Sequence, residues 1–171
     1  MALDPPLEAS ADEIRAALAP LRNDFSIAID KAGNPFAVGA IIRVAHSFLA
    51  REIILIGDEP HYEKASMGMH KFESIVRVPD ELALLEHIGA RPMWVVEKDD
   101  ARVNIASVLS FPKDVVFVFG SERFGVRPAL MERADEIVGI QLYGVNHSLP
   151  VVVAAGIVMH EWARRHYGAR V

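Results

Sequence analysis

The chain has 171 residues, of which 51% are apolar, a formal net charge of −5 and no cysteine. This length and composition predict a globular domain with its own core rather than a disordered segment, and the absence of cysteine excludes disulfides, zinc–thiolate sites and cysteine nucleophiles. The acidic balance argues against broad, non-specific binding of nucleic acid, which depends on phosphate neutralisation, but it leaves room for a local basic patch.

The first part of the chain predicts a tail and one short helix, residues 1–22, ahead of a single domain over residues 23–171. Ser10 and Glu13 have the spacing of a capping box, and Pro20 ends the helix that follows them. The first residues lack the basic flank and apolar core of a signal peptide, and no apolar run approaches the roughly 20 residues of a membrane span. We therefore expect a cytoplasmic protein with no membrane partner.

From residue 25 onward, predicted strands alternate with predicted helices. This alternation predicts an α/β fold with a mainly parallel sheet and helices on both faces. The first turns of the last helix are apolar on every side, which predicts that it is buried all round. The predicted strands are 25–30, 53–57, 74–78, 93–97, 115–119 and 136–142, and the predicted helices are 36–49, 62–67, 79–87, 128–133 and 151–166.

Three polar loops lie at strand or helix ends, where open α/β sheets bind their ligands. The first, residues 34–48, places Arg43 among Ile41, Ile42 and Val44 on a mostly apolar helix. A buried guanidinium needs an anionic partner, because an unpaired buried charge is unfavourable. Arg43 is therefore a structural partner of a carboxylate, an exposed arginine, a phosphate clamp or a reaction-centre residue.

The second loop, residues 119–125, follows the most strongly apolar strand directly. Gly120 and Gly125 allow a sharp turn and the close approach of a ligand to the backbone. The loop has neither the Gly-Lys-Ser/Thr end of a Walker A loop nor the Gly-x-Ser-x-Gly spacing of a nucleophile elbow. By itself it is either a structural turn or part of a ligand site.

The third loop starts at Asn146 and runs into the last predicted helix. Ser148 is a candidate N-cap of that helix, and the backbone N–H groups there are alternatively able to hold a carboxylate or a reacting oxygen. The histidines show no metal-ligand spacing, because His160 and His166 are six residues apart, not the four of a zinc-binding His-Glu-x-x-His helix. We expect no metal site.

In their order and spacing, the three loops resemble the three motifs of the SpoU/TrmH family of RNA 2′-O-ribose methyltransferases, within the SPOUT superfamily. The first family motif, roughly Asn-x-x-Asn-x-Gly-Ala-x-x-Arg-Thr-Ala, is matched by residues 34–45. The second, Phe-Gly-x-Glu-x-x-Gly, is matched by residues 119–125, with residues 140–142 matching the strand end that follows it. The third, Ser-Leu-Asn-Val-Ser-x-Ala-x-Gly, is matched by residues 148–156. The resemblance covers about residues 25–166.

The resemblance implies a deep trefoil knot, in which the last helix is tucked through a preceding loop. It also implies a homodimer formed through the C-terminal helix and the motif-one helix, S-adenosyl-L-methionine as cofactor, and methyl transfer to a ribose 2′-hydroxyl of tRNA or rRNA. The positions that match the family's functional residues are Arg43, Glu122 and Ser148 for catalysis; Glu97, Phe119, Gly120, Ile140, Leu142, Ser148 and Leu149 for cofactor binding; and Asn34, Arg43 and Arg123 for RNA binding.

Arg43 matches the essential arginine of the family. A guanidinium stays protonated and is a poor general base, so we expect an electrostatic role, in which Arg43 holds the RNA phosphate and stabilises the developing alkoxide. Glu122 is expected to shape its loop or to pair with Arg43 across the pocket. The family's cofactor is held largely by backbone groups, with Glu97 and Ser148 at the pocket edge.

The chain departs from the family motifs at four positions. Ala37 replaces the second asparagine of motif one and Val44 its threonine, while Pro150 and Val152 replace the asparagine and the following serine of motif three. These departures keep a second hypothesis open, a catalytically impaired SPOUT module that binds the cofactor or RNA.

Two neighbours of the altered third motif, Asn146 and His147, are candidates to replace the missing amide groups. Little chain precedes the first predicted strand, so we expect no appended RNA-binding domain, which favours a compact tRNA over a large rRNA site as substrate. A Rossmann-like nucleotide enzyme is disfavoured, because no Gly-x-Gly-x-x-Gly follows a first strand.

Overall fold

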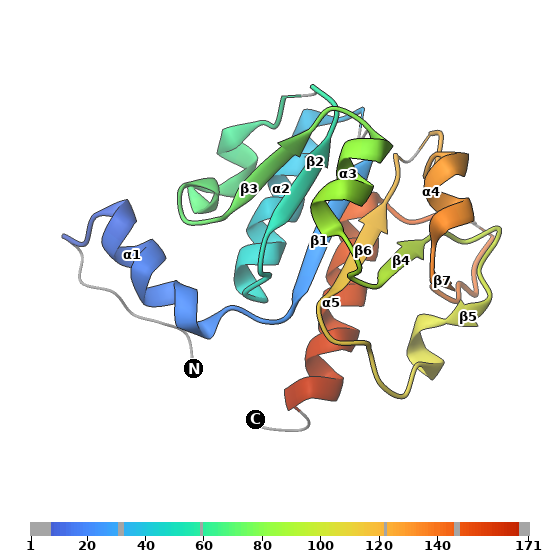
Figure 1. The fold of residues 1–171 in the computed structure, drawn as a ribbon. Helices are drawn as coiled ribbons and strands as arrows, with labels where there is room; N and C mark the ends of the chain where they lie inside the picture. Colours follow the sequence, from blue (N-terminus) through green and yellow to red (C-terminus); the bar gives the residue numbers. More distant parts are fainter. Residues whose placement is uncertain (1–7, 31–32, 59, 122, 146–147, 168–171) are drawn as a thin grey trace.

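The computed structural model describes residues 8–30, 33–58, 60–121, 123–145 and 148–167. Strands and helices alternate along the described chain, as the sequence predicts (Figure 1). The strands are β1 (Phe25–Asp30), β2 (Ile53–Ile56), β3 (Ile75–Val78), β4 (Met93–Val96), β5 (Val103–Asn104), β6 (Val115–Phe119) and β7 (Glu136–Gly139). The α-helices are α1 (Ala11–Leu18), α2 (Pro35–Ser47), α3 (Glu81–Ile88), α4 (Pro128–Arg133) and α5 (Val151–Tyr167), and the 3-10 helices are η1 (Ala19–Leu21), η2 (Glu63–Ser66), η3 (Met69–Lys71) and η4 (Ile105–Ser107).

The seven strands form one parallel sheet in the order β3-β2-β1-β6-β4-β7-β5. β1 lies between β2 and β6, where Ile27 pairs with Ile53 on one side and Phe117 on the other. β1, β2 and β6 are buried at every residue, which is typical of parallel strands covered on both faces. The burial of β1 includes its two polar residues, Ser26 and Asp30.

Helices cover both faces of the sheet, as predicted. In Figure 1, α3 and α4 lie in front of the sheet, and α2 and α5 lie behind it. Behind the sheet, Trp162 of α5 packs on Phe25 with ring centroids 4.7 Å apart, next to the buried Ile41 of α2. In front, Leu84 of α3 and Leu130 of α4 belong to a second apolar cluster. The two layers together hold the strands whose carboxyl ends carry the polar loops.

α1 precedes the sheet and has the predicted capping box. The Glu13 carboxylate accepts a hydrogen bond from the backbone N–H of Ser10 at 2.8 Å, and the Ser10 hydroxyl accepts one from the N–H of Glu13 at 3.3 Å. Arg15 connects α1 to the body of the protein by donating to the carbonyl of Lys71 at 3.2 Å. No helix in the described part of the chain is long and apolar enough to cross a bilayer.

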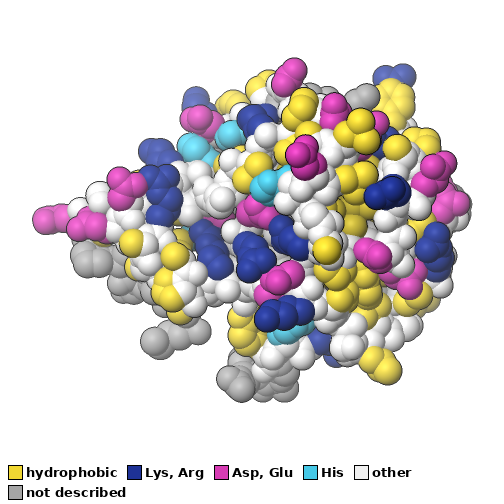
Figure 2. Space-filling model, viewed as in Figure 1, with side chains coloured by type: hydrophobic (Ala, Val, Ile, Leu, Met, Phe, Trp, Pro, Cys, Tyr) yellow, Lys and Arg dark blue, Asp and Glu magenta, His cyan; other side chains and the backbone are white. Residues whose placement is uncertain are grey.

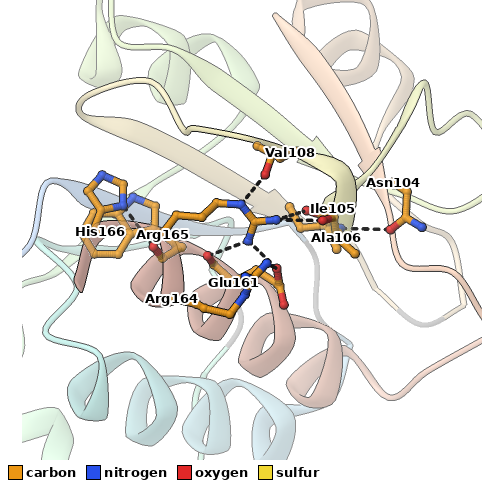
Figure 3. A network of polar contacts seen from close by, with 9 residues as sticks. Asn104, Ile105, Ala106, Val108, Glu161, Arg164, Arg165 and His166 are labelled. Atoms are coloured by element: carbon orange, nitrogen blue, oxygen red, sulfur yellow. Dashed lines mark hydrogen bonds and ion pairs between the residues drawn. The ribbon is translucent and has the colours of Figure 1, made fainter. Parts of the chain in front are cut away.

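Arg165 anchors the C-terminal half of α5 to the segment after β5 (Figure 3). Its guanidinium donates to the carbonyls of Ala106 at 2.9 Å and Ile105 at 3.2 Å, and also to the carbonyl of Val108. The same guanidinium pairs with Glu161 one helical turn earlier. The side chain of Arg165 is only 8% exposed, so one buried cation satisfies carbonyls of η4 and of Val108, the residue that follows it.

Two predicted elements differ in detail from the observed ones, and one observed strand was not predicted. The helix predicted over 62–67 is the shorter 3-10 helix η2. The strand predicted over 136–142 ends at Gly139, because the adjacent strand β5 pairs with Val138 and Gly139 and ends there. β5 itself was not predicted, because two residues are too few to show a period.

The last helix is not buried on all sides within one chain. Ala155, Val158 and Met159 are fully buried, but Val153 is 43% exposed and His160 is exposed. The sheet and α2 cover one side of α5, and its other apolar side faces outward. The prediction of complete burial is therefore wrong for the single chain.

Candidate functional site

A pocket of about 840 Å³ opens at the carboxyl ends of β4, β6 and β7. The loops after these strands, the helix α4 and the segment that leads into α5 form its walls. Open α/β sheets bind ligands at this edge, and the volume lies within the range of small-molecule sites. The second and third motif loops, which are distant in sequence, therefore meet at one pocket.

Every residue that the family resemblance assigns to cofactor binding lines this pocket. β7 ends at Gly139, and Ile140 and Leu142 of the segment that follows line the pocket. Cofactor binding itself remains a prediction for these positions. The residues concerned are Glu97, Phe119, Gly120, Ile140, Leu142, Ser148 and Leu149.

Hydrogen bonds within the loop after β6 close it into a compact turn. The backbones of Ser121 and Gly125 exchange two hydrogen bonds, at 3.2 and 2.9 Å, and the Ser121 hydroxyl accepts a third from the N–H of Phe124 at 3.0 Å. Gly125 has a φ of +65°, and a Cβ at this position would lie 2.6 Å from a carboxylate oxygen of Glu97. Glycine thus allows the loop to turn directly against the end of β4.

Charged side chains of both signs surround the pocket. Of those that follow β4, only Glu97 was predicted, although the charged run after it was a usable signal for the others, Lys98, Asp99, Asp100 and Arg102. A rim of mixed sign suits a ligand that itself carries both charges. Within the described residues, no group of three or more His, Cys, Asp or Glu is placed to hold a metal ion. The charged residues are Glu97, Lys98, Asp99, Asp100, Arg102, Arg123 and Glu132.

Arg43 lies outside the lining of this pocket. It is exposed on α2, and the described residues offer its side chain no hydrogen-bond or ion-pair partner. Its neighbours Ile41 and Ile42 are fully buried, and the helical period turns Arg43 away from them. Of the alternatives that the sequence left open, an exposed arginine is the one found in the single chain.

Asn34 also lies outside the pocket lining, where it caps α2. Its side-chain oxygen accepts hydrogen bonds from the backbone N–H groups of Phe36 at 3.0 Å and Ala37 at 3.4 Å. This arrangement satisfies two N–H groups that a helix start leaves without partners. The observed role of Asn34 is structural, and its contact with RNA stays a prediction.

Ser148 lines the pocket but does not occupy the N-cap position predicted for it. α5 begins at Val151, and the carbonyl of Pro150 accepts the hydrogen bonds of the first turn. Ser148 is exposed two residues before Pro150. Three residues that the sequence analysis singled out lie outside the described residues, namely Glu122, Asn146 and His147.

Arg123 lines the pocket beside an exposed aromatic ring. Its guanidinium carbon lies 5.1 Å from the ring centroid of Phe124, which is 76% exposed and also lines the pocket. Arginine and aromatic side chains are the groups on which unpaired RNA bases stack. This pair is therefore consistent with the predicted RNA contact of Arg123.

On the face that α3 and α4 cover, Lys and Arg side chains gather near the middle of the view, with Asp and Glu side chains beside them (Figure 2). At the amino edge of the sheet, Arg51 pairs with Asp114 at 2.8 Å and Arg91 pairs with Glu52 at 2.5 Å. These arginines are therefore already neutralised within the chain.

A family model and several named proteins match the chain. Residues 24–160 match the model of the SpoU rRNA Methylase family. The chain is 28% identical over 142 residues to the 23S rRNA (guanosine-2′-O-)-methyltransferase RlmB of Coxiella burnetii, a match that covers 80% of this chain and 57% of the relative. It is also 28% identical over 165 residues to the tRNA (guanosine(18)-2′-O)-methyltransferase of Aquifex aeolicus, over 93% of this chain and 78% of that protein.

Solved structures share the fold. The TrmH/SpoU tRNA modifying enzyme of A. aeolicus superposes with a TM-score of 0.79 at 27% identity, over 92% of this chain and 82% of that one. The AdoMet-bound rRNA methyltransferase of Sinorhizobium meliloti superposes with a TM-score of 0.75 at 28% identity, over 90% and 60% of the two chains. The chain spans 57% of the C. burnetii relative and 59% of the next, the Putative TrmH family tRNA/rRNA methyltransferase YacO of Bacillus subtilis.

Proposed function

The chain belongs to the SpoU rRNA methylase family, and from this premise we propose that it is an S-adenosylmethionine-dependent methyltransferase acting on a ribose 2′-hydroxyl of tRNA or rRNA. The observation that carries the proposal is the pocket at the carboxyl edge, because all positions that match the family's cofactor residues line it. Relatives named as rRNA and tRNA 2′-O-methyltransferases support the reaction, and the AdoMet-bound S. meliloti enzyme supports the cofactor.

The residues of the pocket fit S-adenosylmethionine. The cofactor is zwitterionic with an added positive charge, and the pocket offers about 840 Å³ with charges of both signs at its rim. Backbone groups of Gly120, Ile140 and Leu149 would hold the adenine of the cofactor, and the Glu97 carboxylate would accept hydrogen bonds from the hydroxyl groups of the cofactor's ribose. When bound, the cofactor supplies a methyl group activated by the positive sulfur.

Arg43 would act on the RNA rather than on the cofactor. A 2′-hydroxyl is a weak nucleophile and must lose its proton near the moment of attack. The Arg43 guanidinium stabilises the developing alkoxide and holds the adjacent phosphate, while the proton leaves to the phosphate or to a water. Ser148, exposed at the pocket, orients the reacting hydroxyl, and the alignment of the oxygen with the methyl group supplies much of the rate.

The proposed enzyme is a homodimer that assembles through α2 and α5. These helices are neighbours behind the sheet (Figure 1), and each carries an exposed apolar residue, Phe36 at 60% on α2 and Val153 at 43% on α5. Apolar surface of this kind marks an interaction site. Arg43 is exposed on the same helix as Phe36 and does not line the pocket of its own chain. We therefore propose that dimer assembly brings Arg43 to the reacting atoms at the pocket of the second copy.

Residues 23–171 are proposed to form one domain whose C-terminal part is tied in a trefoil knot. Residues of the loop after β6 and of the segment that leads into α5 line the same pocket. This supports a chain path in which α5 begins beside the loop through which it would pass. We propose tRNA rather than rRNA as the substrate. Of the relatives named above, the A. aeolicus tRNA enzyme matches the largest share of both chains.

Methyl transfer tests the proposal directly. Purified protein is incubated with labelled S-adenosylmethionine and total undermodified RNA, and digested nucleosides are analysed by mass spectrometry. We expect a 2′-O-methylated nucleoside with the wild type and a loss of about 100-fold or more with Arg43→Ala. Lys113→Ala, which removes an exposed cation near the amino edge, is the control and should retain activity. A wild type without any ribose methylation, or an Arg43→Ala variant as active as wild type, contradicts the proposal.

A catalytically impaired module that binds the cofactor or RNA is the second candidate. Ala37 places a methyl group, 5% exposed, where the family has an amide, and Pro150 has no N–H to offer at the start of α5. Calorimetry with S-adenosylmethionine separates the two candidates when combined with the assay above. Tight cofactor binding without turnover on any RNA favours the module.

A further inference from the structure

A buried ion pair joins the end of β1 to the start of α4. Asp30, the last residue of β1, is 1% exposed, and its carboxylate accepts three kinds of hydrogen bond from Arg127. Nε donates at 2.9 Å, Nη2 donates at 2.6 Å, and the backbone N–H of Arg127 donates at 3.0 Å. The remaining guanidinium nitrogen, Nη1, pairs with Glu81 at the start of α3.

This cluster lies directly behind one wall of the pocket. Val126 and Pro128, the two neighbours of Arg127 in sequence, line the pocket, whereas Arg127 is not part of the lining. The loop 120–126 therefore ends at the residue that Asp30 holds. On the other side, β1 leads within four residues to Asn34, the cap of α2.

Stability alone gives little reason for such a pair. Removing two charges from water is unfavourable, and a buried ion pair is often no better for stability than apolar residues of the same volume. A planar guanidinium that binds a carboxylate through two nitrogens instead fixes the relative orientation of the two side chains, because this forked arrangement requires both groups to be coplanar. The hydrogen bonds that the Asp30 carboxylate accepts also raise the pKa of Arg127, so the guanidinium stays charged.

We propose that Arg127, held by Asp30 and Glu81, is a positioning residue that fixes residues 120–121 and 123–126 of the loop after β6 in the shape that binds S-adenosylmethionine. The inference rests on the proposed function, because it concerns the same pocket. Loss of the contacts of Arg127 with Asp30 and Glu81 would leave the pocket residues present but imprecisely placed, and a binding site whose supporting contacts are missing holds its ligand less well.

Arg127→Lys is the principal variant, because lysine keeps the charge but cannot form the fork. The matched control is Arg91→Lys. Arg91 pairs with Glu52 at 2.5 Å at the opposite edge of the same sheet, and the exposed fractions of the two arginine side chains are 18% and 19%. Both variants lose one largely buried arginine that pairs with a carboxylate, through a single nitrogen in Arg91 and as a fork in Arg127, but only Arg127 adjoins the pocket.

Cofactor affinity is measured by calorimetry and stability by urea unfolding for both variants. We expect Arg127→Lys to raise the Kd for S-adenosylmethionine about tenfold or more and its KM similarly, with a smaller change in kcat at saturating cofactor. Arg91→Lys should lower stability by a comparable amount and leave the Kd within about twofold. Glu81→Gln removes only the outer, half-exposed partner and should give a smaller rise in Kd in a folded protein.

The outcomes separate this inference from the proposed function. If the wild type binds S-adenosylmethionine and Arg127→Lys and Glu81→Gln bind it equally well, the positioning role of Arg127 is overturned. The proposed function then still stands. Equal losses of affinity in Arg127→Lys and Arg91→Lys also overturn the positioning role, because they show a general effect of stability. A wild type that does not bind the cofactor overturns the proposed function first.

Discussion

Gly120 lies against the backbone of Gly125 so closely that a Cβ on Gly120 would fall 2.1 Å from the carbonyl carbon of Gly125. No side chain fits at that distance, and the atoms it would meet belong to the backbone, which cannot rotate away. The contact closes the loop that lines the pocket, so the shape of the pocket depends on residue 120 having no side chain.

Gly120→Ala should therefore damage the pocket before it damages the fold. We expect a loss of stability of about 1–3 kcal/mol from overpacking and a rise of at least about tenfold in the Kd for S-adenosylmethionine, measured by urea unfolding and calorimetry. Ile88→Val, which removes one methyl group from the fully buried side of α3, is the control and should cost about 1 kcal/mol without changing the Kd. Unchanged cofactor affinity in Gly120→Ala would contradict this account of the loop.

The sequence predicts most of the fold because its local signals agree with the final packing. The apolar runs 115–119 and 53–56 become fully buried parallel strands, the second one residue shorter than predicted, and the capping box of Ser10 and Glu13 forms as predicted. The second and third of the three polar loops also meet at one pocket, as expected for the carboxyl edge of a parallel sheet, whereas the first lies outside the pocket lining. These features depend on short stretches of chain and on a general rule of sheet architecture.

Features that depend on distant partners were not predictable. Asp30 and Arg127 are 97 residues apart, and no local pattern indicates that an aspartate ending a strand will accept the fork of that arginine. The outward direction of Arg43 and the exposure of Val153 have a related cause. Both depend on which side of a helix the rest of the chain covers, and an apolar sequence does not say whether the cover comes from the same chain or from a second copy.

Val153→Glu tests the proposed dimer surface. Val153 is 43% exposed in the single chain, so a carboxylate there remains in water in a monomer but is buried unpaired in a dimer packed on α5. We expect sedimentation velocity to show a dimer for the wild type and a monomer for the variant, with the far-UV circular dichroism unchanged. Leu109→Glu, at a position 93% exposed in the segment before β6, should remain dimeric. A dimeric Val153→Glu variant would place the interface elsewhere.

Arg165→Ala tests the anchor of α5. The variant leaves the carbonyls of Ile105, Ala106 and Val108 without their donor, and each buried polar group without a partner is unfavourable by about 1–3 kcal/mol. Water will reach part of the site, so we expect a total loss of about 2–4 kcal/mol in the free energy of unfolding. Arg164→Ala is the matched control, because Arg164 also pairs with Glu161 but is 54% exposed, and it should cost less than about 1 kcal/mol. Equal losses in the two variants would show that the backbone contacts of Arg165 contribute nothing.

Glu161 should make the stability of the protein depend on acid pH. Burial acts to raise the pKa of this carboxyl, but hydrogen bonds from Arg165 and Arg164 outweigh it and hold the pKa below the ordinary value of 4.5. A lowered pKa in the folded state means that the ionised carboxylate stabilises the fold above pH 4.5, and that this contribution disappears as the pH falls through the folded-state pKa. We therefore expect the difference in unfolding free energy between wild type and Glu161→Gln to be largest near about pH 7 and to shrink towards about pH 3, measured by urea unfolding at each pH. Glu86→Gln, which alters an exposed glutamate that makes no ion pair among the described residues, should differ from wild type by a small and nearly constant amount. A Glu161→Gln difference that stays constant over the same range would show that the arginines of α5 stabilise the helix without help from this carboxylate.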